Sequence, residues 1–515
     1  MCIDMLDRGA SLFADRACLI DDTGTKTYAD VSVESHRIAN ALRRDGAGFG
    51  KHVAILSPNA SRAFECILGV FRAGAVWVPL NARNATEENA YILDNTDVTL
   101  LFYHSRFEPE IAQLREGAPR VARFVCLDKR GGYGTFYEDW LAGVGDVAEE
   151  APRDPESLCA IVSSGGTTGR PKGVMHTHRL WEAVAASYHT MLPTRKPAVH
   201  LVAAPMTHAA GIIALPLLSV GATQVIQPGA DPLAIMQAIE THKVTHLFLP
   251  PTVIYMMLAH PRVREFDYSS LDYFIYAAAP MSVDKLKQSV DVFGPVMCQV
   301  YGQVEAPMYC TVMTPEEHVT ALTEGREQRL WSCGRPSLYT RVAIMDDDEH
   351  LLETGERGEI VVRSSLVMKG YYRNPEATAE ASAHGWHHTG DIGYCDEDGY
   401  VYIVDRKRDM IISGGFNVFP SEIEQVVWAH PAVQDCAVIG IPDEKWGEAV
   451  TAVIELRAGA AVSEAEIIAL CKQHLGGVKA PKSVLFWDKL PRSPVGKVLK
   501  KDIRTRFWEG HSRSI

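Results

Sequence analysis

A loop rich in glycine and hydroxyl side chains follows an apolar stretch, Leu158–Val162. The loop reads Ser163-Ser164-Gly165-Gly166-Thr167-Thr168-Gly169-Arg170-Pro171-Lys172-Gly173. Its glycines let backbone N–H groups approach a phosphate closely, its hydroxyls add donors, and Lys172 supplies a positive charge. The segment therefore predicts a phosphate cradle after a buried strand. It is not the G-x-x-x-x-G-K-[ST] loop, because Gly173 follows the lysine.

Four further segments follow this loop along the chain. They are Tyr301-Gly302-Gln303-Val304-Glu305, His388-Thr389-Gly390-Asp391, Asp405-Arg406 with Gly414-Gly415-Phe416-Asn417 and Pro420–Glu424, and Pro491–Lys497. In type and order, the five segments resemble the signatures of the adenylate-forming superfamily, which comprises acyl-CoA synthetases, adenylation domains of peptide synthetases and luciferases. The resemblance spans about residues 160 to 500. It implies that a carboxylic acid reacts with ATP to an acyl-adenylate and then with coenzyme A to a thioester.

The resemblance also assigns roles for the first step, in which two anions, a carboxylate and the α-phosphate, must meet among cations. It makes Lys497 the main catalytic cation and Glu305 the carboxylate that holds Mg²⁺, an ion that prefers one or two carboxylates plus phosphates. It implies that Asp391 binds the ribose hydroxyls and that Arg406 contacts the nucleotide on its ribose and phosphate side. The other ATP and AMP contacts that it implies are Tyr301, Gly302 and Ala278.

The acid is predicted from two apolar segments, Pro205–Gly211 and Ala277–Met281. By resemblance, His208 and Gly211 lie at the mouth of the acyl pocket and Ala277 lines it. Neither segment contains Arg or Lys, and a second carboxylate would need a buried cation. We therefore expect an aromatic or medium-chain aliphatic acid rather than a dicarboxylate.

The second step depends on the C-terminal part of the chain. By resemblance, Gly414, Gly415 and Phe416 guide the thiol arm of coenzyme A, and Arg408 is the hinge about which a small domain rotates. Two positions depart from the family pattern, because Gly165 and Val304 stand where relatives carry hydroxyl residues. Three alternatives stay open: an enzyme that loads a carrier protein, a luciferase-like oxygenase, and a decayed, non-catalytic nucleotide-binding protein.

The sequence around these residues alternates between short apolar runs, which predict buried strands, and segments with helical spacing of apolar residues. With 515 residues, the chain is long enough for two or more domains. We expect an α/β N-terminal domain over residues 1–407, made of layered subdomains and a β-rich part after Ser337, and a small mobile α+β domain over 408–515. After the apolar run His52–Leu56, Asn59 is expected to cap a helix.

The composition of the chain excludes several classes of binding partner. The formal net charge is -13 and no basic block occurs, so no nucleic acid is expected. No apolar run reaches about 18 residues, so no membrane span is expected. The eleven scattered cysteines suit a reducing cytoplasm. The histidines show no ligand spacing, so no metal other than Mg²⁺ is expected. A small carboxylic acid, ATP and coenzyme A are the expected partners, and a homodimer is compatible with the sequence.

Overall fold

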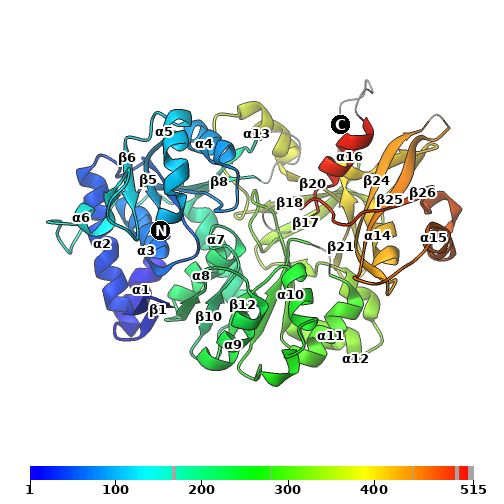
Figure 1. The fold of residues 1–515 in the computed structure, drawn as a ribbon, viewed down its shortest axis with the longest axis horizontal. Coiled ribbons are helices and arrows are strands. Elements are labelled where there is room, and N and C mark those ends of the chain that lie inside the picture. Colours follow the sequence, from blue (N-terminus) through cyan, green and yellow to red (C-terminus); the bar gives the residue numbers. More distant parts are fainter. Residues whose placement is uncertain (165–169, 280, 444, 493–497, 509–515) are drawn as a thin grey trace.

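A computed structural model describes residues 1–164, 170–279, 281–443, 445–492 and 498–508. The large N-terminal domain, coloured blue to yellow-green in Figure 1, contains two sheets with helices around them and a separate antiparallel sheet. The smaller C-terminal domain, orange to red, packs against one side of it. The predicted α/β class, with a large and a small domain, is confirmed.

One sheet carries the strand that leads into the predicted phosphate loop. Its order is β19-β9-β8-β4-β3-β5-β6-β7. Strands β3 to β6 and β8 run parallel and β9 returns antiparallel to β8. The bounds are β3 His52–Leu56, β4 Val76–Pro79, β5 Val98–Tyr103, β6 Arg123–Cys126, β7 Thr135–Phe136, β8 Leu158–Ser163, β9 Gly173–Thr177 and β19 Gly370–Tyr371. The glycine-rich loop therefore joins two adjacent strands.

The second sheet has the order β16-β15-β14-β13-β12-β10-β11-β1-β2. Strands β1 and β10 to β14 run parallel, so their carboxyl ends share one edge. The bounds are β1 Ala17–Asp21, β2 Gly24–Thr27, β10 Val199–Val202, β11 Thr223–Ile226, β12 His246–Phe248, β13 Tyr273–Tyr276, β14 Met297–Tyr301, β15 Thr311–Met313 and β16 Arg335–Pro336.

The helices of the large domain connect these strands, as the alternating pattern predicts. They are α1 Asp4–Phe13, α2 Tyr28–Arg44, α3 Ser61–Ala73, α4 Thr86–Asn95, α5 Ile111–Gly117, α6 Tyr137–Trp140, α7 His178–Met191, α8 Ala209–Leu218, α9 Pro232–His242, α10 Pro251–Leu258, α11 Val283–Phe293, α12 Pro315–Thr323 and α13 Pro375–Ala381. No helix within the described ranges is long and apolar enough to cross a membrane.

The predicted Asn59 cap is wrong. Ala60 occupies the N-cap position of α3. The Asn59 side chain instead donates to the carbonyl groups of Ala204 and Gln227 and accepts from the backbone of Met206. With the Val202 carbonyl, four backbone groups from distant segments therefore hold the amide, which local sequence cannot reveal.

The β-rich part after Ser337 is confirmed as a sheet of order β17-β18-β20-β21, with β17 Thr340–Met345, β18 Gly358–Ser364, β20 His387–Cys395 and β21 Val401–Arg406. The C-terminal domain has its own sheet, in which β23-β22-β25-β24 is extended by β26 beside β25. Its elements are β22 Ile411–Ser413, β23 Phe416–Val418, α14 Pro420–Trp428, β24 Val433–Asp443, β25 Gly447–Leu456, α15 Glu464–Lys479, β26 Ser483–Phe486 and α16 Lys500–Trp508. The predicted boundary at 407/408 falls in the turn Lys407–Asp409 between the two sheets.

Candidate active site

Three of the predicted site segments follow parallel strands of the second sheet. Pro205–Gly211 follows β10, Ala277–Ala279 follows β13, and Gly302–Glu305 follows β14. Because these strands share their direction, the three segments meet at the carboxyl edge of the sheet, the usual place for ligands in α/β folds.

Asp391 lies at the centre of a polar cluster beside this edge. Its Oδ2 accepts hydrogen bonds from the Tyr301 hydroxyl at 2.6 Å and from Gln303 Nε2 at 2.9 Å. Its Oδ1 lies 2.5 Å from Nε of Arg406, whose Cα pairs with that of Asp391 across β20 and β21. The carboxylate is 3% exposed and is fixed on three sides. The cluster joins the predicted residues Tyr301, Asp391 and Arg406.

Gln303 is a site residue to which the sequence motifs assigned no role. Besides Asp391, its amide donates to the Thr389 carbonyl at 2.7 Å and accepts from His387 Nε2 at 3.3 Å. It thus ties the segment after β14 to β20. The sequence signal that could have identified it is its position between Gly302 and Val304, inside the recognised motif Tyr301–Glu305.

Glu305 contacts the phosphate-loop side of the site through a tyrosine. The Tyr371 hydroxyl donates to Glu305 Oε1 at 2.8 Å, and Nζ of Lys172 lies 4.7 Å from the centre of the Tyr371 ring. Burial raises the pKa of Tyr371, so it remains a donor at neutral pH. Within the described residues the Glu305 carboxylate accepts only this bond, which leaves oxygen lone pairs for a cation such as Mg²⁺.

His176 fixes the same segment from β9. Its Nε2 donates to the Val304 carbonyl at 2.7 Å. The ring is 1% exposed, and burial lowers the pKa of His176 to about 4. The imidazole is therefore neutral at pH 7, which suits a donor to a carbonyl rather than an ion partner. No motif or spacing in the sequence singles out His176.

The base of the phosphate loop is closed by two hydrogen bonds. The backbone N–H of Ser164 donates to the Lys172 carbonyl at 2.9 Å, and the Lys172 N–H donates to Ser164 Oγ at 3.1 Å. The two ends of the loop therefore lie side by side where β8 ends and β9 begins. The predicted phosphate contacts between them, Gly165, Gly166, Thr167, Thr168 and Gly169, lie outside the described residues.

Two predicted nucleotide contacts have unusual backbone surroundings. A Cβ on Gly302 would lie 2.4 Å from the backbone N of Met308, so only glycine fits there. Ala278 has a φ of 73°, which a residue with a Cβ adopts at a cost. Strain of this kind persists where surrounding structure imposes it, and it marks the strand end as a candidate contact.

The predicted acyl-pocket residues lie at the same sheet edge. His208 precedes α8, its Nδ1 lies 2.9 Å from Thr207 Oγ1, and burial lowers its pKa to about 4. A Cβ on Gly211 would lie 1.9 Å from the Met206 carbonyl oxygen, so this turn requires glycine. Ala277 packs against the same apolar core as the first turns of α8.

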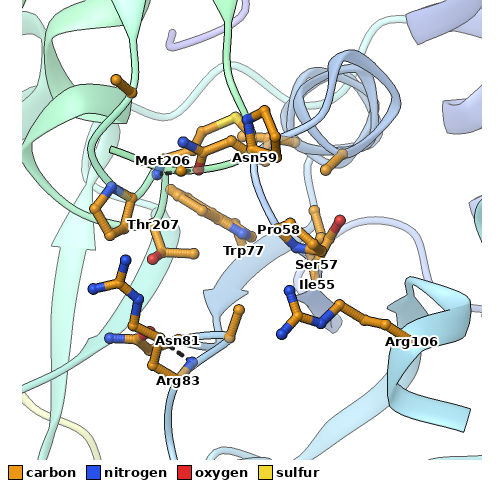
Figure 2. A pocket seen from close by; sticks show the side chains of 17 residues that line it. Ile55, Ser57, Pro58, Asn59, Trp77, Asn81, Arg83, Arg106, Met206 and Thr207 are labelled. Atoms are coloured by element: carbon orange, nitrogen blue, oxygen red, sulfur yellow. Dashed lines mark hydrogen bonds between the residues drawn. The ribbon is translucent and has the colours of Figure 1, made fainter. Parts of the chain in front are cut away.

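A cavity of about 170 Å³ adjoins Met206 and Thr207. It lies between the carboxyl ends of β3 and β4 in one sheet and of β10 and β11 in the other. Figure 2 shows Arg106 reaching in from one side and Arg83 lying on the other, with Trp77 between them. Neither arginine was predicted from the sequence, because neither belongs to a recognised motif.

The turn predicted to guide coenzyme A joins β22 to β23. Gly414 and Gly415 have φ values of 59° and 82°, and a Cβ on Gly414 would lie 2.8 Å from the Trp446 ring. Both positions therefore require glycine. Phe416 is 58% exposed, so in this arrangement of the domains the turn faces solvent.

The residues on either side of the predicted hinge make ion pairs within each domain and one hydrogen bond between the domains. Lys407 lies 3.6 Å from Glu359 of β18, whereas the carboxylate of Asp409 lies 3.5 Å from Arg504 of α16. Asp405 accepts from the backbone N–H of Ser421 at the start of α14. The side chain of Arg408 and all of Lys497 lie outside the described residues.

Family models match the two parts of the chain. Residues 6–372 match the AMP-binding enzyme family and residues 422–497 match the AMP-binding enzyme C-terminal domain. A feruloyl-CoA synthase from Amycolatopsis sp is 38% identical over 489 residues, which cover 93% of this chain and 94% of that protein. An indoleacetate–CoA ligase from Aromatoleum aromaticum is 32% identical over 97% of each chain.

Solved structures show the same fold. The amide bond synthetase McbA from Marinactinospora thermotolerans superposes with a TM-score of 0.89, 30% identity and coverage of 98% of this chain and 100% of that one. The anthranilate CoA ligase AuaEII, in complex with anthranoyl-AMP, gives a TM-score of 0.90 at 26% identity over 98% and 97%. The chain therefore belongs to the AMP-binding enzyme family, within the adenylate-forming superfamily.

Proposed function

We propose that this enzyme activates an aromatic or medium-chain carboxylic acid with ATP and Mg²⁺ and transfers the acyl group to coenzyme A. Its class is that of the AMP-forming acid–thiol ligases, as for the named CoA ligases among its relatives. The observation that carries the proposal is the position of the segment Tyr301–Glu305. One end bonds to Asp391, a ribose partner, and the other bonds through Tyr371 to the side of the phosphate loop.

Under this proposal, the chain orients ATP along that segment. Asp391, already fixed by Tyr301, Gln303 and Arg406, accepts from the ribose hydroxyls with its remaining lone pairs. Glu305, oriented by Tyr371, would hold Mg²⁺, which supplies charge neutralisation on the phosphates when bound. Lys497 would then bring the carboxylate and the α-phosphate together before pyrophosphate departs.

Two kinds of evidence, the pocket residues and the named relatives, support an apolar acid as the substrate. His208 is neutral at pH 7, because burial lowers its pKa, and Ala277 is small and borders the apolar core. The named relatives act on ferulate, indoleacetate and fatty acids. We infer an aromatic acid as the best candidate. AMP release with coenzyme A over a panel of acids tests this inference.

Coenzyme A as acceptor is supported by the cavity with Arg83 and Arg106. Two guanidinium groups suit the phosphates of a nucleotide-bearing thiol. The eleven free cysteines suit a reducing compartment, so we place the reaction in the cytoplasm. The carrier-protein alternative is supported by one relative, a fatty acid–[acyl-carrier-protein] ligase from Streptomyces coeruleorubidus at 32% identity.

The test compares coenzyme A with pantetheine, which has the thiol arm but no nucleotide. We expect kcat/KM for coenzyme A to exceed that for pantetheine at least tenfold, and Arg106→Ala to reduce this preference. A protein that exchanges pyrophosphate into ATP but accepts both thiols equally slowly would favour the carrier-protein alternative. Absence of exchange with every acid would favour the non-catalytic alternative.

A further inference from the structure

Three soft side chains from distant parts of the chain meet inside the large domain. Cys2 precedes α1, Cys159 lies in β8, and His178 begins α7. Their candidate ligand atoms, two thiol sulfurs and one imidazole nitrogen, all lie within 4.8 Å of one another. All three residues are at most 1% exposed. The adenylation reaction gives none of them a role, and the sequence-based expectation of no further metal site overlooked the cluster.

Hydrogen bonds orient the imidazole toward the Cys2 thiol. The backbone N–H of Cys2 donates to Nδ1 of His178 at 3.1 Å, and Cys2 Sγ lies 3.2 Å from the same nitrogen. A nitrogen that accepts from a backbone N–H carries no proton, so Nδ1 offers a lone pair on the Cys2 side of the ring, and an ion bound there would take the place of the Cys2 N–H. This is the protonation state in which histidine binds metals.

The spacing is close to that of a tetrahedral site. With a metal–sulfur bond of about 2.3 Å and a metal–nitrogen bond of about 2.0 Å, the two donor atoms lie roughly 3.5 Å apart. The observed separation of 3.2 Å between Cys2 Sγ and His178 Nδ1 differs from this by a few tenths of an ångström. A small side-chain shift therefore brings this pair to ligand spacing, and every separation in the cluster is within 4.8 Å.

The charges of the three ligands indicate which class of ion they would bind. Two thiolates and one neutral imidazole carry two negative charges, and an uncompensated charge in the core is costly. Sulfur and imidazole ligands together favour Zn²⁺ over Mg²⁺ or Ca²⁺. We propose that Cys2, Cys159 and His178 bind one thiophilic divalent cation of the Zn²⁺ class. Two metal–sulfur bonds and one metal–nitrogen bond form, and the two thiol protons pass to solvent.

The position of this site links the N-terminal segment to the base of the phosphate loop. Cys159 lies on β8, which leads into the loop, and His178 directly follows β9, which leads out of it. A bound ion would therefore hold the segment before α1 against both flanking strands. We expect its main effect on stability rather than on the chemical step.

Cobalt titration tests the proposal on the full-length protein, freed of metal by a chelator and kept reduced. Added Co²⁺ should bind at one ion per chain and give a thiolate-to-cobalt charge-transfer band, which added Zn²⁺ abolishes. The band should be lost in Cys2→Ala and in Cys159→Ala. It should weaken in His178→Asn, whose side-chain oxygen still accepts from the Cys2 N–H. Cys471→Ala, at a buried thiol of α15, is the matched control and should keep the band.

Three results would overturn the proposal. The first is a folded wild-type protein, verified by circular dichroism, that gives no charge-transfer band. The second is a band of unchanged intensity in the Cys2→Ala, Cys159→Ala double variant, which would place the ion elsewhere. The third is failure of Zn²⁺ to raise the thermal unfolding midpoint of the wild type more than that of the double variant. Pyrophosphate exchange is measured separately, so the outcome for the metal site does not depend on the proposed function.

Discussion

Tyr371 and Glu305, which are 66 residues apart, share a hydrogen bond of 2.8 Å. The Tyr371 ring also lies under the ammonium group of Lys172. One side chain therefore contacts both the carboxylate proposed to hold Mg²⁺ and the cation at the base of the phosphate loop. Under the proposed function Tyr371 would be a positioning residue, because it would act on the phosphates through these two neighbours.

Removing this hydroxyl should weaken the response to magnesium. In Tyr371→Phe, the ring remains under Lys172 but Glu305 loses its donor. A hydrogen bond to a charged group is worth about 1.5–3 kcal/mol, and water can replace part of it at this half-buried site. We expect pyrophosphate exchange to fall about three- to tenfold and the Mg²⁺ concentration for half-maximal rate to rise. Tyr372→Phe, which loses a bond to Asp97, is the control; an equal effect there would contradict the role.

Lys497 should serve the first half-reaction only. In Lys497→Ala, adenylate formation should be nearly abolished, because no other proposed residue bridges the carboxylate and the α-phosphate. A chemically supplied acyl-adenylate should still react with coenzyme A. Rapid-quench measurement of each half-reaction checks this, with Lys501→Ala as the exposed control from α16. Equal loss in both half-reactions would refute the assignment.

Val304 stands where the family pattern has threonine, and we expect this difference to lower the adenylation rate only slightly. Val304 is held at its carbonyl by His176, so its backbone position does not depend on the side chain. We expect the unmodified enzyme to be active and Val304→Thr to increase adenylation by no more than about tenfold. Initial rates of pyrophosphate exchange measure the difference. Exchange that appears only in Val304→Thr would support the decayed-enzyme alternative.

Stability should fall in mild acid. Burial lowers the pKa of several enclosed histidines to about 4 in the folded protein: His176, His200 and His318. Unfolded, each titrates near 6.5, so the unfolded chain binds more protons between about pH 6.5 and 4, and stability is lost as the pH falls through that window. Each histidine accounts for a loss of up to about 2 kcal/mol between pH 7 and pH 5.

The histidine effect can be isolated with one variant. His318→Gln removes one titrating group and should reduce the drop in thermal midpoint between pH 7 and pH 5. His350→Gln, at an exposed residue, should leave that drop unchanged. If both variants lose stability with pH as the wild type does, His318 is not neutral in the folded state.

The choice of acid should follow the apolar surroundings of Ala277 and His208. We expect benzoate- or cinnamate-like acids, or unbranched acids of moderate length, to give a higher kcat/KM than malonate or succinate. AMP release with coenzyme A measures the ratio. A preference for a dicarboxylate that disappears in Arg106→Ala would instead assign the arginines of the cavity to the acid.

Local patterns predicted most elements of this fold. The apolar run Leu158–Val162 forms β8, and the alternation after Ser337 forms the antiparallel sheet. Motif order also placed Asp391 and Arg406 among the candidate site residues; the register of β20 and β21 sets them opposite each other, a pairing that the motifs did not predict. Each of these inferences needs only neighbouring residues or a motif with a known order.

Contacts between distant segments could not be predicted in this way. His176 and Val304 are 128 residues apart, and Cys2 and His178 are 176 apart. Neither pair belongs to a periodic pattern, and both depend on how segments far apart in the sequence come together in the folded chain. The prediction that Asn59 caps a helix is wrong for the same reason. Its side-chain amide donates to carbonyl groups from distant segments instead of binding the start of the adjacent helix.

The bonds made by residues 405–409 divide between the two domains. Arg406 and Lys407 bond to Asp391 and Glu359 of the large domain, whereas Asp405 and Asp409 bond to α14 and α16 of the small one. A rotation of the small domain about residue 408 would break the bond from Ser421 to Asp405 and leave the other bonds intact, because each of those lies within one domain. Asp391 would thus stay fixed while the small domain turns. Under the proposed function, an acyl-adenylate held at Asp391 would keep its ribose contacts from one half-reaction to the next.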